Sequence, residues 1–289
     1  MRFKTAGLAA VLFGLGVASS ASAADMAVKA PPAPAAIVPL PSWTGFYVGI
    51  NGGGAGTENQ SMTYTDLAIN AYFPATVNAS ATSGLAGFHA GYNYQFAPNW
   101  LLGVEGDWDW TSLKSSGTQN LVCAGAGRVQ CGGINLVFTD NASLNTNINW
   151  LASVRGRLGY ASNQWLLYAT GGVAFAEMDF GARVNCTNIA PSFCGGGAQS
   201  IDTRFKDTRV GAVVGGGIEY KPASNWIFGL EYLYYHFDSA SAGGNWFVVS
   251  SGAPAPFFEC SVAGQNCAKF SFGDVGIHTG RFRLSYQFN

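Results

Sequence analysis

Charged residues are scarce in this chain. Lys, Arg, Asp and Glu make up 11% of its 289 residues, whereas ordinary soluble domains carry roughly 25%. The formal net charge is −1, so the chain lacks the strongly basic face that a nucleic-acid partner requires. Hydrophobic residues at 48%, aromatic residues at 14% and 39 glycines instead indicate a protein that faces something other than water.

Long apolar runs are also missing. After the N-terminal region, no segment offers the roughly 20 uninterrupted apolar residues that a transmembrane helix needs. Only helices and closed barrels satisfy their backbone hydrogen bonds in lipid. If this chain lies in a membrane, we therefore expect it to cross as a β-barrel.

Residues suited to catalysis are few. The chain has three histidines, His89, His236 and His278. A His paired with Ser or Asp at the outer rim would be the place for a lipid-modifying site, but no motif marks one. We predict a protein that is not an enzyme and that has no metal and no other cofactor.

The first 23 residues have the organisation of a secretory signal peptide. A basic start at residues 1–4 precedes an apolar run at 7–17, and Ala21-Ser22-Ala23 forms a cleavage site. We predict cleavage after Ala23; a membrane anchor is the alternative. Residues 24–42 are rich in Ala and Pro, which predicts an extended periplasmic linker. The barrel domain would occupy residues 43–289.

Alternation with a period of two dominates the rest of the chain. Near the C-terminus, Phe282, Leu284 and Tyr286 alternate with Arg283 and Ser285. A row of lipid-facing aromatics opposite a polar row is the pattern of a transmembrane barrel strand. The predicted strands are 43–54, 82–96, 100–112, 146–161, 165–180, 207–221, 226–238 and 275–288. The predicted fold is all-β, an eight-stranded antiparallel up-and-down transmembrane barrel.

The predicted connections alternate in length. Short turns lie at 97–99, 162–164 and 222–225, and long connections at 55–81, 113–145, 181–206 and 239–274. Outer-membrane barrels have short periplasmic turns and long outer loops. Both termini would then lie on the periplasmic side.

Tryptophans and tyrosines recur beside the short turns. A Trp follows each turn, and a Tyr stands before each turn and before the C-terminus. The set is Trp100, Trp165, Trp226, Tyr94, Tyr160, Tyr220 and Tyr286. Amphipathic rings prefer the membrane–water boundary, so we predict a periplasmic aromatic girdle. Packing in an ordinary core is the alternative.

The chain also contains an internal repeat. Residues 99–105 resemble residues 225–231, and residues 155–160 resemble residues 281–286, both at a spacing of 126 positions. The third and fourth predicted strands therefore resemble the seventh and eighth. In an eight-stranded barrel these pairs would lie on opposite walls.

Most strand charges have the parity of the barrel interior. They are Glu105, Asp107, Asp109, Arg155, Arg157, Arg209, Glu219, Glu231, Arg281 and Arg283. Counted from the turns, Glu105 is level with Arg157, Asp107 with Arg155, and Glu231 with Arg283. Side chains just fill an eight-stranded barrel, and buried charges must be paired. We predict a network of ion pairs that closes the lumen. A constriction that selects permeating ions is the alternative.

Six cysteines form three local pairs in the predicted outer loops. They are Cys123 with Cys131, Cys186 with Cys194, and Cys260 with Cys267. An oxidising compartment favours disulfides, and local closure is the shortest of the 15 possible pairings. Zinc binding is disfavoured, because no CxxC spacing occurs and no His lies near a pair.

The stretch Trp43-Thr44-Gly45-Phe46-Tyr47-Val48-Gly49-Ile50-Asn51-Gly52-Gly53 carries a family resemblance. Together with Gly87, Gly91-Tyr92, the Asn-Trp turns, Arg-x-Arg-Leu-x-Tyr and Tyr286-Gln287-Phe288, it resembles the porin-family or outer membrane immunogenic proteins of alphaproteobacteria. The resemblance implies an OmpA-like eight-stranded barrel, surface exposure and a role in envelope integrity. Haem binding is attributed to some members, but no residue here is assigned to a haem site. Many outer-membrane proteins end on an aromatic residue that the barrel-assembly machinery reads; here Asn289 follows Phe288.

We therefore predict an integral protein of the bacterial outer membrane that stabilises the envelope and displays four long loops. Its expected partners are outer-membrane lipid, lipopolysaccharide and the barrel-assembly machinery. A narrow porin for small solutes is one alternative. A surface receptor or adhesin is another, acting through loop residues such as 245–249.

Overall fold

The computed structural model describes residues 42–66, 71–76, 79–123, 138–186, 199–244, 246–248 and 268–288. The predicted signal peptide and all but the last residue of the predicted linker lie outside these ranges, so both stay predictions. In the described ranges, no helix is long and apolar enough to cross a membrane.

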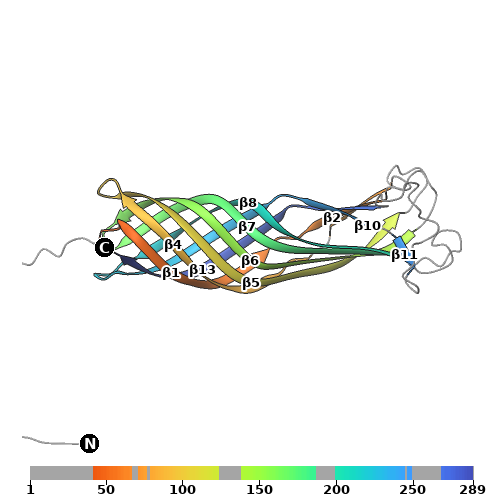
Figure 1. The fold of residues 1–289 in the computed structure, drawn as a ribbon, viewed down its shortest axis with the longest axis horizontal. Helices are drawn as coiled ribbons and strands as arrows, with labels where there is room; N and C mark the ends of the chain where they lie inside the picture. Colours follow the sequence, from red (N-terminus) through yellow and green to blue (C-terminus); the bar gives the residue numbers. More distant parts are fainter. Residues whose placement is uncertain are drawn as a thin grey trace, which may run out of the picture. The chain divides into compact units, whose positions relative to one another are not determined.

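Eight antiparallel strands of the described chain close into a ring (Figure 1). They are β1 (Gly45–Thr57), β4 (Thr82–Gln95), β5 (Trp100–Cys123), β6 (Phe138–Ser162), β7 (Trp165–Cys186), β8 (Gln199–Tyr220), β9 (Trp226–Phe237) and β13 (Val275–Phe288). Sequence neighbours pair around the ring, and β13 closes it by pairing with β1. The predicted fold class is confirmed.

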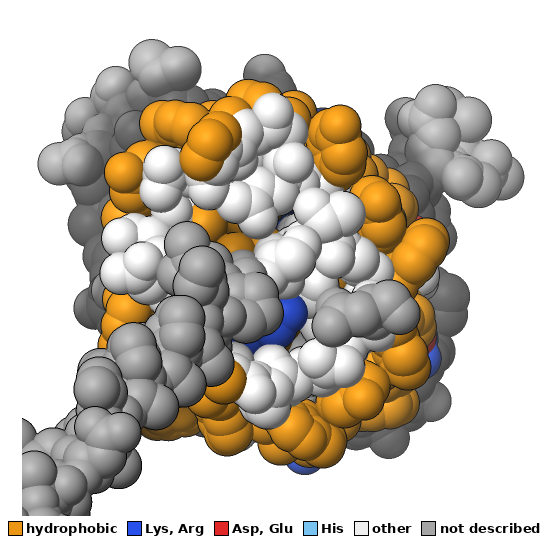
Figure 2. All heavy atoms as spheres, turned by 90° about the vertical axis from the view of Figure 1, so that its left-hand side faces the viewer, with side chains coloured by type: hydrophobic (Ala, Val, Ile, Leu, Met, Phe, Trp, Pro, Cys, Tyr) orange, Lys and Arg blue, Asp and Glu red, His pale blue; other side chains and the backbone are white. Residues whose placement is uncertain are grey.

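The half of the barrel next to the short turns is apolar on the outside. Phe46, Leu102 and Phe282 point outward and are 67%, 52% and 73% exposed, whereas the intervening inward positions carry the buried charges. Viewed from the end with the short turns, hydrophobic side chains surround a polar centre (Figure 2). Lipid on one side and a narrow interior on the other account for the period-two pattern.

The four central strands are longer than predicted. β5 continues to Cys123, β6 begins at Phe138, β7 continues to Cys186 and β8 begins at Gln199. The described residues of the predicted loops 113–145 and 181–206 are thus strand. Beyond the lipid-facing band the outward residues become polar while the inward residues become apolar. A prediction that followed lipid-facing aromatics therefore made each of these four strands too short.

A second sheet lies within the predicted connections 55–81 and 239–274. It has the order β10 (Ala240–Gly244), β12 (Ala268–Phe272), β2 (Ser61–Asp66) and β3 (Ala71–Thr76). A short strand, β11 (Trp246–Val248), pairs separately with β8. The ring of Phe272 on β12 lies 5.0 Å from that of Phe180 on β7 and 5.6 Å from that of Phe205 on β8. The second sheet therefore covers an apolar core formed by the strand extensions.

Three tryptophans on β5 and β6 lie between the apolar band and these extensions. We call Trp108, Trp110 and Trp150 the outer aromatic belt. Trp110 is 57% exposed, and the rings of Trp108 and Trp150 stack at 4.3 Å. Close to the belt, the β5–β6 register shifts between Trp110 and Leu113, and the β6–β7 register skips Asn149. Eleven residues run from Trp100 to Trp110, which matches the 9–11 residues of a tilted transmembrane strand.

The chain enters the barrel through Trp43, inside the mouth with the short turns. Trp43 precedes β1, two residues before the strand begins, and is 1% exposed. It belongs to a buried apolar cluster with Leu101, Leu166 and Ile227. Beside this cluster, Lys221 donates to the carbonyl of Ser42 at 2.7 Å and to Gln287 at 2.8 Å.

Candidate functional site: a charge network inside the barrel

The inward rows of five strands bring nine charged residues together in the lumen. β5 supplies three acids, β6 and β13 supply two arginines each, and β8 and β9 supply one glutamate each. They are Glu105, Asp107, Asp109, Arg155, Arg157, Glu219, Glu231, Arg281 and Arg283, and each is at most 7% exposed. Arg209, which has the same parity, lies apart at the outer rim, where it donates to the carbonyls of Asp238 and Ser239.

The strand register differs from the predicted one by two residues. Glu105 lies opposite Arg155 rather than Arg157, Asp107 lies opposite Ser153, and Glu231 lies opposite Arg281. The prediction counted equal distances from the turns, but Trp100 pairs with Tyr160, two residues before the end of β6. Neighbouring strands of a barrel are staggered, so equal distances from two turns do not mean equal heights.

Arginine side chains are nevertheless long enough to reach carboxylates that lie at a different height in the barrel. Arg157 lies 3.1 Å from Glu105 and 2.7 Å from Glu219. Arg155 lies 2.5 Å from Glu105 and 3.0 Å from Asp107. Each of these arginines thus holds two carboxylates on β5 or β8.

The second half of the repeat has a similar arrangement. Arg283 lies 2.8 Å from Glu231, and Arg281 lies 2.7 Å from Glu231 and 3.2 Å from Asp107. Arg281 also forms an ion pair with Asp109. The expected partners Glu231 and Arg283 therefore lie together, but neither pairs exclusively with the other.

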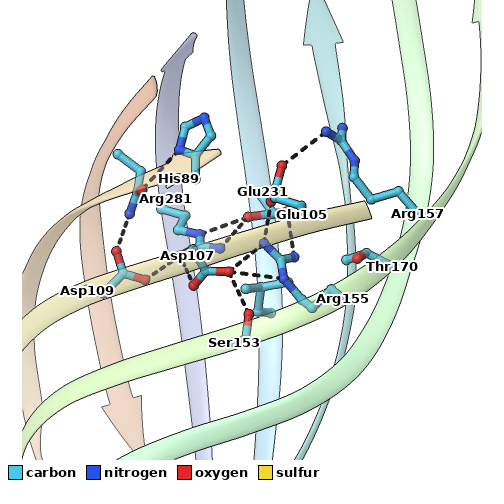
Figure 3. A network of polar contacts seen from close by, with 12 residues as sticks. His89, Glu105, Asp107, Asp109, Ser153, Arg155, Arg157, Thr170, Glu231 and Arg281 are labelled. Carbon is cyan, nitrogen blue, oxygen red and sulfur yellow. Dashed lines mark hydrogen bonds and ion pairs between the residues drawn. The ribbon is translucent and has the colours of Figure 1, made fainter. Parts of the chain in front are cut away.

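Besides the contacts of Arg281 with Asp107 and Asp109, two glutamate contacts join the halves of the repeat across the lumen. Arg155 on β6 donates to Glu231 on β9 at 2.9 Å, and Arg283 on β13 donates to Glu105 on β5. Neither pair of strands is adjacent in the sheet. The prediction placed a separate ion pair on each wall, whereas the structure has one interlocked network (Figure 3).

Two tyrosines that the sequence prediction missed complete the network. Tyr47 donates to Glu105 at 2.7 Å and accepts from Arg157 at 2.6 Å. Tyr168 donates to Glu231 at 2.9 Å, and the Arg157 guanidinium lies 3.9 Å from the centre of its ring. Both tyrosines have inward parity, which is the sequence signal that marks them, whereas the predicted aromatic set contained only lipid-facing residues.

Glycines on neighbouring strands make room for these rings. A Cβ at Gly91 would lie 2.4 Å from the Tyr47 hydroxyl, and a Cβ at Gly217 would lie 2.6 Å from the Tyr168 hydroxyl. Gly91 and Gly217 are themselves 126 positions apart, like the repeated charges. The repeat thus preserves the space for the tyrosines as well as the ion pairs.

Uncharged polar side chains also donate hydrogen bonds to Asp107 and Asp109 on β5. Ser153 donates to Asp107 at 2.5 Å, and Asn51 donates to Asp109. His89 lies 3.2 Å from Asn51 and 2.7 Å from the hydroxyl of Ser285. His89 is therefore part of this hydrogen-bonded cluster, which holds the carboxylates in fixed positions.

The aromatic residues of the predicted girdle lie at the end of the barrel with the short turns. Trp100, Trp165 and Trp226 face Tyr160, Tyr220 and Tyr286 across neighbouring strands, with ring centroids 5.4, 4.8 and 5.2 Å apart. Tyr94 is 56% exposed at the same end. The outward Trp–Tyr pairs have the placement that the girdle hypothesis requires.

The predicted disulfides fall outside the described part of the chain. Cys131, Cys194, Cys260 and Cys267 are not among the described residues, and the side chains of Cys123 and Cys186 are not described either. Their backbones end β5 and β7. The three pairings stay predictions.

A closed ring with lipid-facing aromatics and a charged interior defines the class of the protein, an integral β-barrel protein of the outer-membrane type. The chain matches the family model "Outer membrane protein beta-barrel domain" over residues 9–288. It belongs to that family, and the family resemblance and the outer-membrane localisation predicted from sequence are confirmed.

Named relatives agree with this assignment. The 31 kDa outer-membrane immunogenic protein of Brucella melitensis is 33% identical over 220 residues, which cover 75% of this chain and 81% of the relative. The 22 kDa outer membrane protein of Rhizobium leguminosarum is 31% identical over 207 residues, 71% of this chain and 69% of the relative. Among solved structures, the outer membrane protein OprG from Pseudomonas aeruginosa is 14% identical, covers 85% of this chain and 97% of its own, and has a TM-score of 0.38.

Proposed function

We propose that this outer-membrane protein is a sealed, non-enzymatic structural barrel that stabilises the envelope and displays its second sheet and outer connections at the cell surface. The observation that carries the proposal is the filled lumen. The charged residues there contact one another rather than lining an open path.

Three successive layers support the sealed interior. Trp43 and its apolar neighbours fill the mouth with the short turns. The nine charged residues fill the middle of the membrane-spanning part. Beyond them, an apolar core that includes Leu113, Ile148 and Phe180 fills the space between the strand extensions and the second sheet. A narrow porin would need a continuous aqueous path through all three layers.

The network also favours a structural role over catalysis. Its arginines and carboxylates neutralise one another, and their side chains are at most 3% exposed. A buried ion-pair network of this kind can fix a unique arrangement of the strands.

Single-channel recording in planar bilayers tests the sealed lumen. The purified full-length protein should give no reproducible conductance steps, in contrast to a porin recorded under the same conditions. Arg157→Ala should conduct no more than the wild type, because the apolar layers at both ends remain. Regular steps from the wild type would establish the porin alternative instead.

A deletion strain tests the envelope role. Loss of the protein should increase sensitivity to detergent, and a plasmid copy of the wild type should restore resistance. Unchanged detergent sensitivity would contradict the proposed role.

The proposed partners follow from the lipid-facing surface. Outer-membrane lipid and lipopolysaccharide would contact the apolar band, and the barrel-assembly machinery would read the last strand, in which Phe288 points outward and is 51% exposed. Replacing Phe288 with Ser should lower the yield of assembled barrel in cells. The same change in outward-facing Val48, which is 47% exposed on the first strand, serves as the control.

A further inference from the structure

A polar groove lies on the outward face of the barrel, beyond the outer aromatic belt. It has a volume of about 420 Å³ and crosses three neighbouring strands. β6 contributes Asn145 and Asn147, β7 contributes Asp179 and Gly181, and β8 contributes Arg204. This volume falls within the range of small-molecule binding sites.

The hollow exists because the middle strand lacks a side chain at its centre. Gly181 lies opposite Asn145 on one side and opposite Arg204 on the other. A Cβ placed on Gly181 would come no closer than 3.9 Å to its neighbours. The position could therefore hold a larger residue without strain, and such a residue would fill the groove.

The arginines of the groove keep donors that are available to a ligand. Arg183 donates from Nη2 to Asp202 at 3.0 Å, and its side chain is 54% exposed. Arg204 donates from Nε and Nη2 to Asp179, at 3.1 and 2.7 Å, and its side chain is 73% exposed. A guanidinium has five N–H donors, so each arginine can hold its aspartate and still bind a phosphate oxygen.

The amides beside these arginines suit sugar hydroxyls. Asn145 and Asn147 point outward along the β6 wall of the groove. An asparagine side chain offers two donors and an acceptor, which can bind hydroxyl groups of either polarity. Guanidinium and amide groups together therefore fit a phosphorylated saccharide better than an apolar or purely anionic ligand.

The height of the groove on the barrel indicates which phosphorylated saccharide is present there. On β7 the lipid-facing row includes Val173, whereas the outward side chains of Glu177, Asp179 and Arg183 are polar. The groove starts directly beyond that change. It is therefore level with the head groups and first sugars of the outer leaflet, where lipopolysaccharide surrounds an outer-membrane barrel.

We propose that this groove binds the phosphorylated inner sugars of lipopolysaccharide, with Arg183 and Arg204 on phosphate and Asn145 and Asn147 on hydroxyl groups. The inference rests on the proposed function, because it takes the barrel to be a structural element embedded among lipopolysaccharide. It adds a specific binding site on β6, β7 and β8 to the general contact between lipid and the apolar band.

Binding measurements with the refolded full-length protein in detergent micelles test the site. The probes are rough lipopolysaccharide that carries core sugars, phosphatidylglycerol and inorganic phosphate. Rough lipopolysaccharide should bind at least about tenfold more tightly than either other probe. Arg204→Ala should weaken its binding by about tenfold, as expected for a lost hydrogen bond to a charged group. Gly181→Trp should weaken it by at least about tenfold, because the indole ring would fill the groove.

Gly280→Trp is the matched control. Gly280 also points outward, and a Cβ there would meet nothing within 4 Å, but it lies away from the groove on β13. This variant should bind like the wild type, and a shift in gel mobility on boiling verifies that each variant is folded.

Equal binding by the wild type and Gly181→Trp would overturn the site, as would absence of binding. Equal affinity for phosphatidylglycerol or inorganic phosphate would overturn the saccharide assignment. None of these outcomes affects the sealed lumen, which is decided by conductance.

Discussion

Arg155 on β6 and Glu231 on β9 are joined across the lumen by a hydrogen bond of 2.9 Å, although their strands are not neighbours in the sheet. Arg283 and Glu105 make the reciprocal contact. The barrel is thus held by its backbone ring and, independently, by side chains that connect its opposite walls.

A double-mutant cycle measures this connection. Arg155→Ala should lower the free energy of unfolding by roughly 3–5 kcal/mol, because it takes a positive charge from Glu105, Asp107 and Glu231 and leaves excess negative charge buried among them. The variant that also carries Glu231→Ala should lose clearly less than the sum of the two single losses. Urea unfolding in detergent gives the three values. Strict additivity would show that the two residues are not coupled.

The exposed pair Arg183 and Asp202 provides the comparison for that cycle. Their side chains are 54% and 47% exposed at a separation of 3.0 Å. Solvent screening should limit their coupling to no more than about 1 kcal/mol. A coupling as large as that of the buried pair would mean that burial is not what makes the network strong.

The second prediction concerns Trp43, which fills the mouth next to the short turns. Trp43→Ala should lower the free energy of unfolding by roughly 3–5 kcal/mol, because it leaves a cavity among Leu101, Leu166 and Ile227. Trp100→Ala is the control, since Trp100 is 45% exposed and Trp43 only 1%. The control should lose less, and an equal loss would contradict a plug at this mouth.

The third prediction concerns the space beside Tyr47. Gly91→Ala should lower the free energy of unfolding by roughly 1–3 kcal/mol, because the new Cβ would lie 2.4 Å from the Tyr47 hydroxyl and 2.6 Å from the carbonyl of Val104. Gly280→Ala introduces the same methyl group where nothing lies within 4 Å. Similar unfolding curves for the two variants would contradict the close approach.

The fourth prediction concerns acid. The hydrogen bond from Arg204 lowers the pKa of Asp179 below its ordinary value of 3.8. A carboxyl whose pKa is lower in the folded state adds stability above its unfolded pKa, and this stability is lost as the pH falls through the folded value. The Tm of the wild type should therefore exceed that of Asp179→Asn at neutral pH, and the difference should shrink as the pH falls below 3.8 and vanish once the pH lies below the folded pKa of Asp179. A difference that does not change with pH would contradict the ionised pair.

The strand order and the outward placement of the Trp and Tyr residues beside the short turns were predictable because lipid imposes a simple pattern. Phe282 and Arg283 are adjacent in sequence and lie on opposite faces, as alternation requires. The Trp and Tyr residues of the girdle recur beside each short turn, so their position could be found without knowledge of the register.

The contacts inside the lumen could not be predicted in the same way. The stagger between tilted strands sets which residues are level, and no local sequence signal records it. Whether Arg155 reaches Glu231 also depends on the diameter of the barrel and on the direction of a long side chain. Parity could name the members of the network, but it could not assign their partners.

The skipped residue Asn149 changes the relation between sequence and solvent along β6. On one side of it, the even-numbered residues Val154 and Leu158 point outward toward lipid and are 62% and 47% exposed. On the other side, the even-numbered residues Leu144 and Ile148 point inward and are each 1% exposed. The same alternate row thus passes from the outside of the barrel to its inside and stays mainly apolar, with Thr146 as a polar member. Because the extra residue exchanges the two faces where the surroundings also exchange polarity, the period-two pattern of β6 continues as the strand passes from membrane to water.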